Sequence, residues 1–356
     1  MAQVNKLLTI SIPTYNRKSQ LLRLLHSIDN QNCIELYQIQ IIDNGSNYSL
    51  RDAVLSEFSY EFVDNIEFII RPLNGGGDYN IASTFIYVNS ELMWLIGDDD
   101  ETLPGSIETI VEKYRSHSEY SFYKYSMNDK QPQKEDIILN DVNDLQRCYK
   151  KGVFYSGDLI FMSNNVYNVA RVRKYFSNCL YYSYCSACQT IPLLRVLMTQ
   201  GEKAMLCKDF VVKYNEPQGD HWNYVKIVAS LGTFLDMNWE NRHQEVKAFF
   251  NIMCSHFGIG EFLLGLLDIK DNSYRDYLYK KARNSVFSSG LGYLGYLTCF
   301  LYRIEVVSGL KVLSVGYGKL YQMQNTFKQN LKEKAKNDEK VARRVQWMKK
   351  FLPKLK

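Results

Sequence analysis

The sequence has no run of strongly apolar residues long enough to cross a lipid bilayer. A spanning helix needs roughly 18 to 20 such residues, and the nearest candidate, residues 285–302, is uncharged but diluted by Gly, Ser and Thr. The stretch before Pro13 is short and has no small-residue cleavage site, so it does not read as a signal peptide. We therefore expect a cytoplasmic protein that does not span the membrane.

The eight cysteines show no regular spacing that would indicate a disulfide framework. A chain of 356 residues that is 46% hydrophobic can bury a core without covalent cross-links. Cys185 and Cys188 form a C-x-x-C pair, but no second pair stands at the spacing of a zinc site. We expect reduced thiols without a metal or redox role.

An excess of positive charge is absent from the chain outside its C-terminal tail. The net charge is +5, yet residues 328–356 alone contain eleven Lys or Arg and three Asp or Glu. Basic residues confined to a tail, without a recognition motif, argue against nucleic-acid binding. Trp347 and Phe351 lie among these cations, which favours binding to an anionic membrane surface on the inner, cytoplasmic face. The alternative is a solvated helix that packs on the rest of the protein.

The first half of the chain alternates strand-like and helix-like patterns. β-Branched and apolar residues dominate four short runs: 6–13, 37–43, 65–71 and 92–97. Helical spacing of apolar residues separates them, for example over 21–28. This rhythm predicts an α/β fold with a Rossmann-like, mostly parallel sheet and helices on both faces.

The second half is less regular. Residues 153–170 read as strand, 188–201 as a helix and 129–150 as a polar excursion or mobile loop. The stretch 203–224 reads as one or two strands followed by a Pro/Gly loop. After about residue 225 the pattern is helical to the end.

Polar clusters follow each of the four predicted strands, in the order "PTYNR", "DNGS", "RPLNGGGD" and "GDDDE". The carboxyl ends of parallel strands meet at one edge of a sheet, where α/β proteins bind ligands. Asp98, Asp99 and Asp100 repel one another unless a cation or hydrogen-bond donors compensate. Mg²⁺ and Mn²⁺ prefer oxygen ligands and often bind carboxylates together with substrate phosphates. A solvated turn is the alternative reading.

The other clusters contain side chains suited to a nucleotide. Asp43 could accept a hydrogen bond from a base, Tyr15 could stack on it, and Arg17 could meet a phosphate. The glycine-rich loop with Gly76 and Asp78 could approach a phosphate closely. Each of these segments is also ordinary turn chemistry.

Taken in order, "ISIPTYNR", "IIDNGS", "RPLNGGGDYNI" and "WLIGDDDETLPGSI" resemble the family 2 glycosyltransferases of the GT-A fold. The likeness is clearest over residues 7–115. Within the family the sequence most resembles transferases of bacterial O-antigen and capsule synthesis, including those that add deoxy or dideoxy sugars. It implies a GT-A catalytic domain over 1–225, with a donor half at about 1–115 and an acceptor half at about 116–225. A helical region with a basic tail would then occupy 226–356.

The resemblance also implies an activity: transfer of a sugar, with inversion, from a nucleotide-diphosphate sugar to a hydroxyl of a glycan or lipid-linked glycan, with Mn²⁺ or Mg²⁺. The implied nucleotide-site residues are Pro13, Tyr15, Asp43 and Arg71, with Asp98 beside the donor. The implied metal ligands are Asp99, Asp100 and His221. Gly97 stands where the first Asp of the metal motif is usual, which moves the ligand role toward Asp99 and Asp100.

The sequence departs from this family at the general base. Inverting members usually have a carboxylate at the start of a helix, where this chain reads "YCSACQT" at 184–190, and Gln189 cannot take a proton. Asp158, Asp220 and His221 are possible substitutes. Two alternatives therefore stand beside an active glycosyltransferase: a sugar nucleotidyltransferase, which should carry a basic, glycine-rich segment after the first strand, and an inactive relative that serves as a binding or scaffold subunit.

Overall fold

The computed structural model describes residues 6–127, 133–215, 224–257, 262–263, 265–266 and 269–284. The chain divides into two compact units, one of residues 1–258 with 276–290 and one of residues 259–275 with 291–356. The side chains discussed below all belong to the first unit. The division into catalytic and C-terminal regions near residue 225 stays a prediction.

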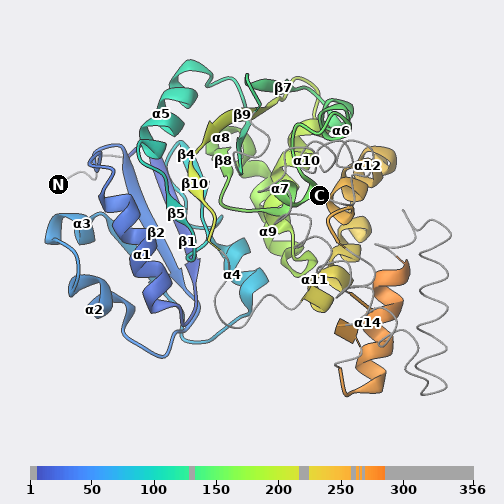
Figure 1. The fold of residues 1–356 in the computed structure, drawn as a ribbon, viewed down its shortest axis with the longest axis horizontal. Helices are drawn as coiled ribbons and strands as arrows, with labels where there is room; N and C mark the ends of the chain where they lie inside the picture. Colours follow the sequence, from blue (N-terminus) through green and yellow to red (C-terminus); the bar gives the residue numbers. More distant parts are fainter. Residues whose placement is uncertain are drawn as a thin grey trace, which may run out of the picture. The chain divides into compact units, whose positions relative to one another are not determined.

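An eight-stranded sheet forms the centre of the first unit (Figure 1). Its strands are β1 (Leu8–Thr14), β2 (Tyr37–Asp43), β3 (Ile66–Ile70), β4 (Leu92–Leu95), β6 (Phe122–Ser126), β7 (Ile137–Leu139), β8 (Asn165–Asn168) and β9 (Ala204–Phe210). The spatial order is β3-β2-β1-β4-β8-β6-β9-β7. β3, β2, β1 and β4 run parallel, whereas β8 is antiparallel to both of its neighbours. A separate antiparallel pair joins β5 (Glu101–Thr102) to β10 (Val212–Lys213).

Helices connect the strands and continue beyond the sheet. They are α1 (Lys18–Asp29), α2 (Leu50–Leu55), α3 (Tyr60–Asp64), α4 (Gly77–Ser83), α5 (Ser106–Ser116), α6 (Val142–Lys150), α7 (Ser156–Ile160), α8 (Val169–Val172), α9 (Phe176–Tyr181), α10 (Ile191–Met198), α11 (Tyr224–Leu231), α12 (His243–Cys254) and α14 (Asn272–Asn284). α12 packs against α6 and α7. In the part of the chain that the structure describes, none of the helices has both the length and the apolar character of a membrane span.

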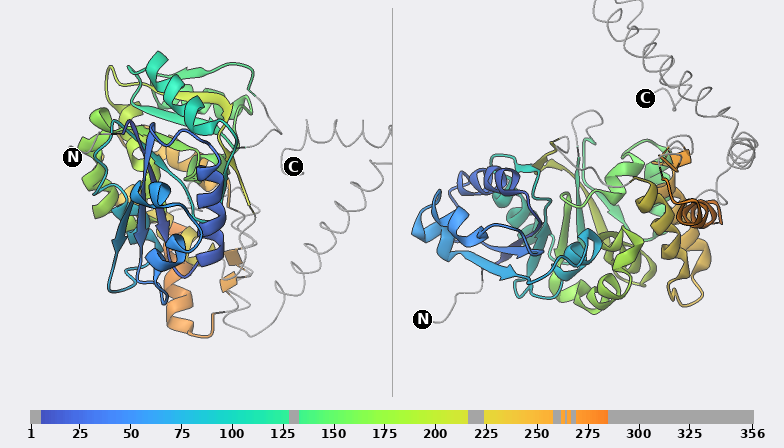
Figure 2. Two further views of the ribbon diagram at one scale, coloured as in Figure 1. Left: turned by 90° about the vertical axis from the view of Figure 1, so that its left-hand side faces the viewer. Right: turned by 90° about the horizontal axis from the view of Figure 1, so that it is seen from below.

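The two faces of the parallel strands differ in chemistry. Leu8, Ile10 and Ile12 of β1 face a core shared with α1, α2, α3 and α5. On the opposite face Ser11 donates a hydrogen bond to Gln40 of β2, and α4 contacts both strands. Figure 2 shows helices on both sides of the sheet. The α/β architecture expected from the sequence, with covered faces, is confirmed.

Two predictions about the second half were wrong. Residues 153–170 were expected to continue as strand, but α7 begins there because Asp158 caps the backbone N–H of Tyr155, and β8 starts only at Asn165. The stretch 129–150, expected to be a loop, contains β7 and α6. In α6 the Asp141 side chain accepts a hydrogen bond from the Asp144 backbone N–H, so the polar sequence is a capped amphipathic helix.

Asn80 of α4 joins the carboxyl ends of β1 and β2. Its buried amide donates hydrogen bonds to the backbone oxygens of Thr14 and Ile42, at 3.2 and 3.1 Å. Both oxygens lie at or near the carboxyl ends of their strands. This contact fixes the glycine-rich loop, which immediately precedes α4, beside the loops that follow β1 and β2.

Candidate active site

The three consecutive carboxylates lie just beyond the end of β4. Asp98 is 5% exposed and accepts a hydrogen bond from Thr14 Oγ1 at 2.8 Å. Arg17 Nη1 lies 3.1 Å from Asp98 Oδ1 and 2.8 Å from Asp99 Oδ2. The Arg17 guanidinium thus pairs with two neighbouring carboxylates, and its expected contact with a phosphate stays a prediction.

Asp100 has partners of its own. Ser163 Oγ donates to Asp100 Oδ2 at 2.5 Å and accepts from the Gly97 backbone N–H at 2.8 Å. The Asn215 backbone N–H lies 3.4 Å from Asp100 Oδ1. Trp94 of β4 fixes the position of Ser163 by donating its indole N–H to the Ser163 carbonyl, at 2.8 Å. Segments far apart in sequence thus converge on one carboxylate.

Burial makes negative charge unfavourable at two of these carboxyls. Desolvation raises the pKa of Asp98 to about 6, although Arg17 and Thr14 act in the opposite direction. Desolvation also raises the pKa of Asp100 to about 7, and the negative charges of Asp99 and Asp98 add to that effect. The ligand-free site therefore disfavours full ionisation, which a bound cation would restore.

The loops after β1 and β2 are joined by hydrogen bonds. The Asn16 backbone N–H donates to Ser46 Oγ at 2.8 Å, and the Asn47 backbone N–H donates to Asn16 Oδ1 at 2.8 Å. Asp43 is buried, and its carboxylate accepts from both the backbone N–H and the hydroxyl of Ser46. A carboxylate has about four lone-pair sites, so Asp43 retains capacity for a ligand donor.

Asn44 connects the second loop to the glycine-rich loop. Its amide group donates to Asn74 Oδ1 at 2.7 Å, and its oxygen accepts from the Gly75 backbone N–H at 3.0 Å. Gly76 has φ +90°, a conformation that side chains with a Cβ rarely adopt. At Gly75 a Cβ would come 2.6 Å from the Tyr79 ring. These glycines are thus required by the fold of the loop itself.

Arg71 and Asp78 lie on either side of the glycine-rich loop in the sequence, and each makes a contact that bears on ligand binding. The Arg71 guanidinium lies over the Tyr79 ring, 4.5 Å from its centroid. Arg71 Nη1 is buried and has no hydrogen-bond partner among the described residues, so a donor is left over for a ligand. Asp78, at the start of α4, accepts from Ser186 Oγ at 3.1 Å, and burial raises its pKa. The glycine-rich loop therefore also contacts the 183–190 segment.

The donor set at the end of β4 fits a hard divalent cation. A Cβ at Gly97 would come 3.1 Å from Asp99 Oδ1 and 3.4 Å from Asp100 Oδ2, so glycine lets both carboxylate oxygens pack close to the backbone. In the described ranges no group of three or more His, Cys, Asp or Glu side chains is arranged to hold a metal ion. Two carboxylates nevertheless suffice where phosphate oxygens and water complete the coordination, as is usual for Mg²⁺.

The structure brings most of the predicted residues to one edge of the sheet. Hydrogen bonds link the loops that carry Arg17, Asp43, Gly76 and Asp98. Tyr15 lies there too, 40% exposed and available for stacking, after the buried Pro13. Asp158 belongs to α7 and takes no part in the carboxylate network. Asp220 and His221 lie outside the described residues.

The segment without an acid has a structural role. Gln189 is 2% exposed, and its amide donates to the Ile160 carbonyl at the end of α7, at 2.6 Å. Cys185 and Cys188 are buried free thiols, and desolvation raises the pKa of Cys185 to about 12. A buried thiol of this kind is inert.

Sequence reasoning missed Thr14, Ser163, Asn215 and Lys124. Thr14, Ser163 and Asn215 are common polar residues whose roles depend on long-range packing. Lys124 did leave a signal, because a lone cation in the centre of the apolar run "SFYKYS" must find buried partners.

Comparison with known proteins identifies the region that contains this site. Residues 9–170 match the family model described as "Glycosyl transferase family 2". The resemblance drawn from the four sequence motifs is thereby confirmed. The matched segment includes the described site residues named above, except those of the 183–190 segment and Asn215.

Relatives of known name extend the comparison. Over 110 residues, 30% of this chain, the sequence is 33% identical to abequosyltransferase RfbV of Salmonella typhimurium, and the aligned stretch spans 32% of that relative. Two structures of S. aureus TarS 1–349, alone and in complex with UDP-GlcNAc, superpose with TM-scores of 0.57 and 0.59. Each covers 88% of this chain and 91% of the other at 13% identity. These structures confirm the fold expected from the sequence.

We expect Asp100→Asn to stabilise the metal-free protein at pH 8. Burial raises the folded-state pKa of Asp100 to about 7, so the protein loses stability as pH rises from about 4, where the unfolded chain ionises, to about 7. The melting temperature of Asp100→Asn in EDTA should exceed that of the wild type at pH 8 by about 2–4 °C per kcal/mol gained. The difference should disappear near pH 3, below the unfolded-state pKa of about 3.8, where Asp100 is protonated in both states.

Glu101→Gln is the matched control. Hydrogen bonds from Asn215 and Lys213, together with the charge of Arg23, outweigh partial burial and lower the pKa of Glu101. Neutralising this carboxylate should therefore reduce the melting temperature at pH 8. If Asp100→Asn also melts earlier than the wild type at pH 8, the carboxyls serve as a structural turn.

Proposed function

We propose that this protein is a glycosyltransferase that moves a sugar from a nucleotide-diphosphate sugar to a hydroxyl of a glycan in bacterial surface polysaccharide synthesis. The observation that carries the proposal is the cluster Asp98–Asp100, buried at the carboxyl end of β4 within a family 2 domain. That position is the ligand-binding edge of a parallel sheet. The family match also argues against a sugar nucleotidyltransferase.

The nucleotide would bind across the loops after β1, β2 and β3. Asp43 would accept a hydrogen bond from the base, and the exposed Tyr15 would stack on it. The unpartnered Arg71 Nη1 would donate to a ribose or phosphate oxygen. Support for such a donor comes from the TarS complex with UDP-GlcNAc and from the name of the partial relative, an abequosyltransferase, which brings deoxy sugars into consideration.

Asp99 and Asp100 would hold a divalent cation, Mn²⁺ or Mg²⁺, with His221 as a further candidate ligand. When bound, the ion would neutralise charge on the diphosphate leaving group. The protein's own part is to keep the carboxylates oriented, which Ser163 does for Asp100 and Arg17 for Asp99. Asp98, held by Thr14 and Arg17, supports that arrangement.

The reaction is proposed to be inverting. The acceptor hydroxyl would attack the anomeric carbon as the diphosphate leaves. Gln189 cannot serve as base, and its amide is committed to α7. Among the candidate bases Asp158 is the one that the structure describes, while Asp220 and His221 are candidates from the sequence.

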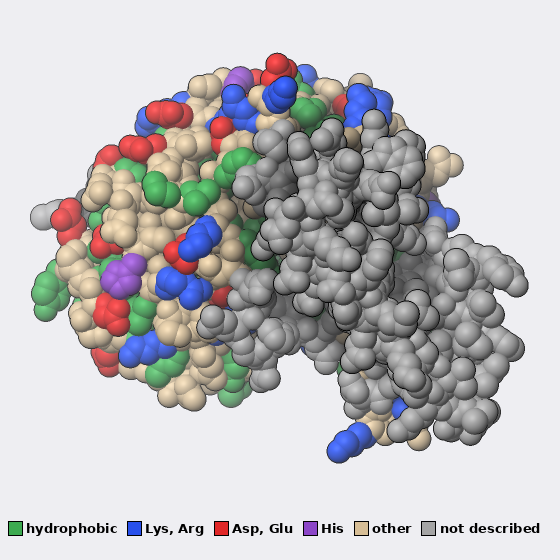
Figure 3. Space-filling model, viewed as in Figure 1, with side chains coloured by type: hydrophobic (Ala, Val, Ile, Leu, Met, Phe, Trp, Pro, Cys, Tyr) green, Lys and Arg blue, Asp and Glu red, His purple; other side chains and the backbone are tan. Residues whose placement is uncertain are grey.

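A lipid-linked glycan acceptor would require contact with the cytoplasmic face of the membrane. On the face drawn in Figure 3, acidic and basic side chains of the described residues are interspersed, without separation by sign. The membrane proposal therefore depends on residues 328–356, whose sequence contains eleven basic and three acidic residues.

We expect Asp100→Asn and Asp99→Asn to abolish metal-dependent release of nucleoside diphosphate from a panel of UDP-, GDP-, CDP- and dTDP-sugars. Each substitution removes a charged ligand of the cation. Glu101→Gln should retain turnover because Glu101 is paired with Lys213 and Arg23 instead. Full turnover by Asp100→Asn would overturn the metal assignment, and an inactive wild type across the panel would favour the scaffold alternative.

Asp43→Asn tests the nucleotide site. Loss of a hydrogen bond to a charged group costs about 1.5–3 kcal/mol, so the affinity for nucleoside diphosphate should fall by one to two orders of magnitude. Ser46→Ala is the control, because it removes a donor to Asp43 but leaves the carboxylate. If both variants weaken binding equally, Asp43 acts only through its turn.

Deletion of residues 328–356 tests the membrane contact. The full-length protein should sediment with anionic vesicles at low salt and detach as the salt concentration rises, because screening weakens attraction between surface charges. The truncated protein should not sediment with anionic vesicles, and neither form should sediment with neutral vesicles. Equal sedimentation of the two forms with anionic vesicles would show that the tail is not the anchor.

A further inference from the structure

Lys124 places an ammonium group inside the protein, in the middle of β6. The residue is 4% exposed. Its Nζ donates to Asn164 Oδ1 at 2.8 Å and to Asn165 Oδ1 at 2.7 Å. An ammonium has three N–H donors, so one remains. None of the ion pairs among the described residues includes Lys124, and burial of a cation without a paired carboxylate is costly.

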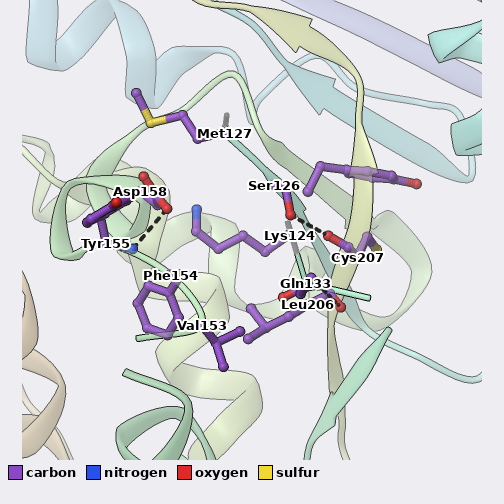
Figure 4. A pocket seen from close by; sticks show the side chains of 11 residues that line it. Lys124, Ser126, Met127, Gln133, Val153, Phe154, Tyr155, Asp158, Leu206 and Cys207 are labelled. Atoms are coloured by element: carbon purple, nitrogen blue, oxygen red, sulfur yellow. Dashed lines mark hydrogen bonds between the residues drawn. The ribbon is translucent and has the colours of Figure 1, made fainter. Parts of the chain in front are cut away.

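Asp158 of α7 lies across a small hollow from Lys124. Its Oδ2 accepts from the Tyr155 backbone N–H at 3.0 Å. Within the described ranges its Oδ1 accepts no hydrogen bond from another residue. Figure 4 shows the Lys124 ammonium and the Asp158 carboxylate both directed into the hollow, with Tyr155 and Phe154 beside them.

The hollow has the size of one small polar group. Its volume is about 20 Å³, whereas a single water needs roughly 10–15 Å³ by the same measure. A hydroxyl can therefore enter, but a sugar ring cannot. Lys124 offers a donor and Asp158 an acceptor, which are the two partners that a hydroxyl needs when it is removed from water.

One short chain segment bonds both to Lys124 and to the carboxylate cluster. Asn164 and Asn165, which bind Lys124, directly follow Ser163, which binds Asp100. Lys124 and Asp100 therefore bind neighbouring residues of one segment, whose consecutive Cα atoms are about 3.8 Å apart. Gln189 stabilises the position of α7, the helix that contains Asp158, because its amide donates a hydrogen bond to the Ile160 carbonyl.

We propose that Lys124 and Asp158 bind the acceptor hydroxyl and that Asp158 takes its proton during transfer, an inference that rests on the proposed glycosyltransferase function. The hydroxyl oxygen forms a bond to the anomeric carbon. The bond from that carbon to the diphosphate oxygen breaks, and its electron pair leaves with the diphosphate. The proton moves to Asp158, while Lys124 remains protonated and donates to the attacking oxygen. The acceptor is thus an alcohol of a glycan whose ring stays outside the hollow.

The charged groups that face Asp158 come from two elements. Lys124 approaches from β6, and His256, which follows α12, places its ring where a Cβ at Gly157 would come within 2.9 Å. Burial raises the pKa of Asp158, whereas Lys124 and His256 act to lower it. Burial also lowers the pKa of Lys124 to about 7, although Asp158 acts to raise it. Loss of the Lys124 charge should therefore raise the pKa of Asp158 further.

Asp158→Asn and Lys124→Met in the full-length chain test the proposal. Calorimetry with nucleoside diphosphate and Mn²⁺ reports donor binding, and sugar transfer to methyl glycosides of common hexoses reports catalysis. Asp158→Asn keeps an oxygen for the helix cap, so we expect unchanged donor affinity and a loss in kcat of roughly 10²–10⁴-fold. Lys124→Met should lower kcat and shift the acidic limb of the pH–rate profile to higher pH.

Lys113→Met is the control for loss of a partly buried cation, because Lys113 pairs with Asp136 and Asp209 and does not line the hollow. It should leave the pH profile unchanged. If Lys124→Met does not fold, Lys124→Gln, which can still donate to the two asparagines, replaces it. Full transfer by Asp158→Asn, or an unshifted pH profile in the Lys124 variant, would overturn the inference. Failure of the wild type to bind or turn over any donor would instead refute the proposed function.

Discussion

Burial of like charge at the end of β4 is the constraint on which the site depends. Asp98 and Asp100 are nearly inaccessible to water, and their ionisation would be prohibitive without compensation. Compensation comes from several segments at once: Thr14 from β1, Arg17 before α1, Ser163 before β8, and Asn215 after β10. The sheet order explains this convergence, because β1 and β8 flank β4.

The segment Ser163–Asn165 compensates a buried negative charge and a buried positive charge through hydrogen bonds. Ser163 donates to a carboxylate, whereas the two asparagines accept from the Lys124 ammonium. Buried polar groups are tolerated only when they are hydrogen-bonded, and this segment satisfies both signs of charge within three residues. The proposed leaving-group and acceptor sites would therefore keep a fixed separation. Such positioning is what a displacement reaction between two bound groups requires.

The sequence predicted the first four strands and the helices between them well because the signals for these elements are local. The strands end where "PTYNR", "DNGS" and "GDDDE" begin, and hydrophobic periodicity reports such boundaries directly. It failed at α7 and α6, whose start depends on single capping side chains, Asp158 and Asp141. Nothing local in the sequence indicates that the Arg17 guanidinium pairs with Asp98 and Asp99. Contacts between distant segments, such as Ser163 with Asp100, leave no periodic trace.

The central claim is that the carboxylates bind a cation jointly with a diphosphate. The most direct measurement is calorimetric titration of a nucleoside diphosphate into the protein, once with Mn²⁺ and once with EDTA. The account predicts that the ion tightens nucleotide binding at least tenfold, and by linkage that the nucleotide tightens Mn²⁺ binding by the same factor. Equal nucleotide affinity with Mn²⁺ and with EDTA would contradict it.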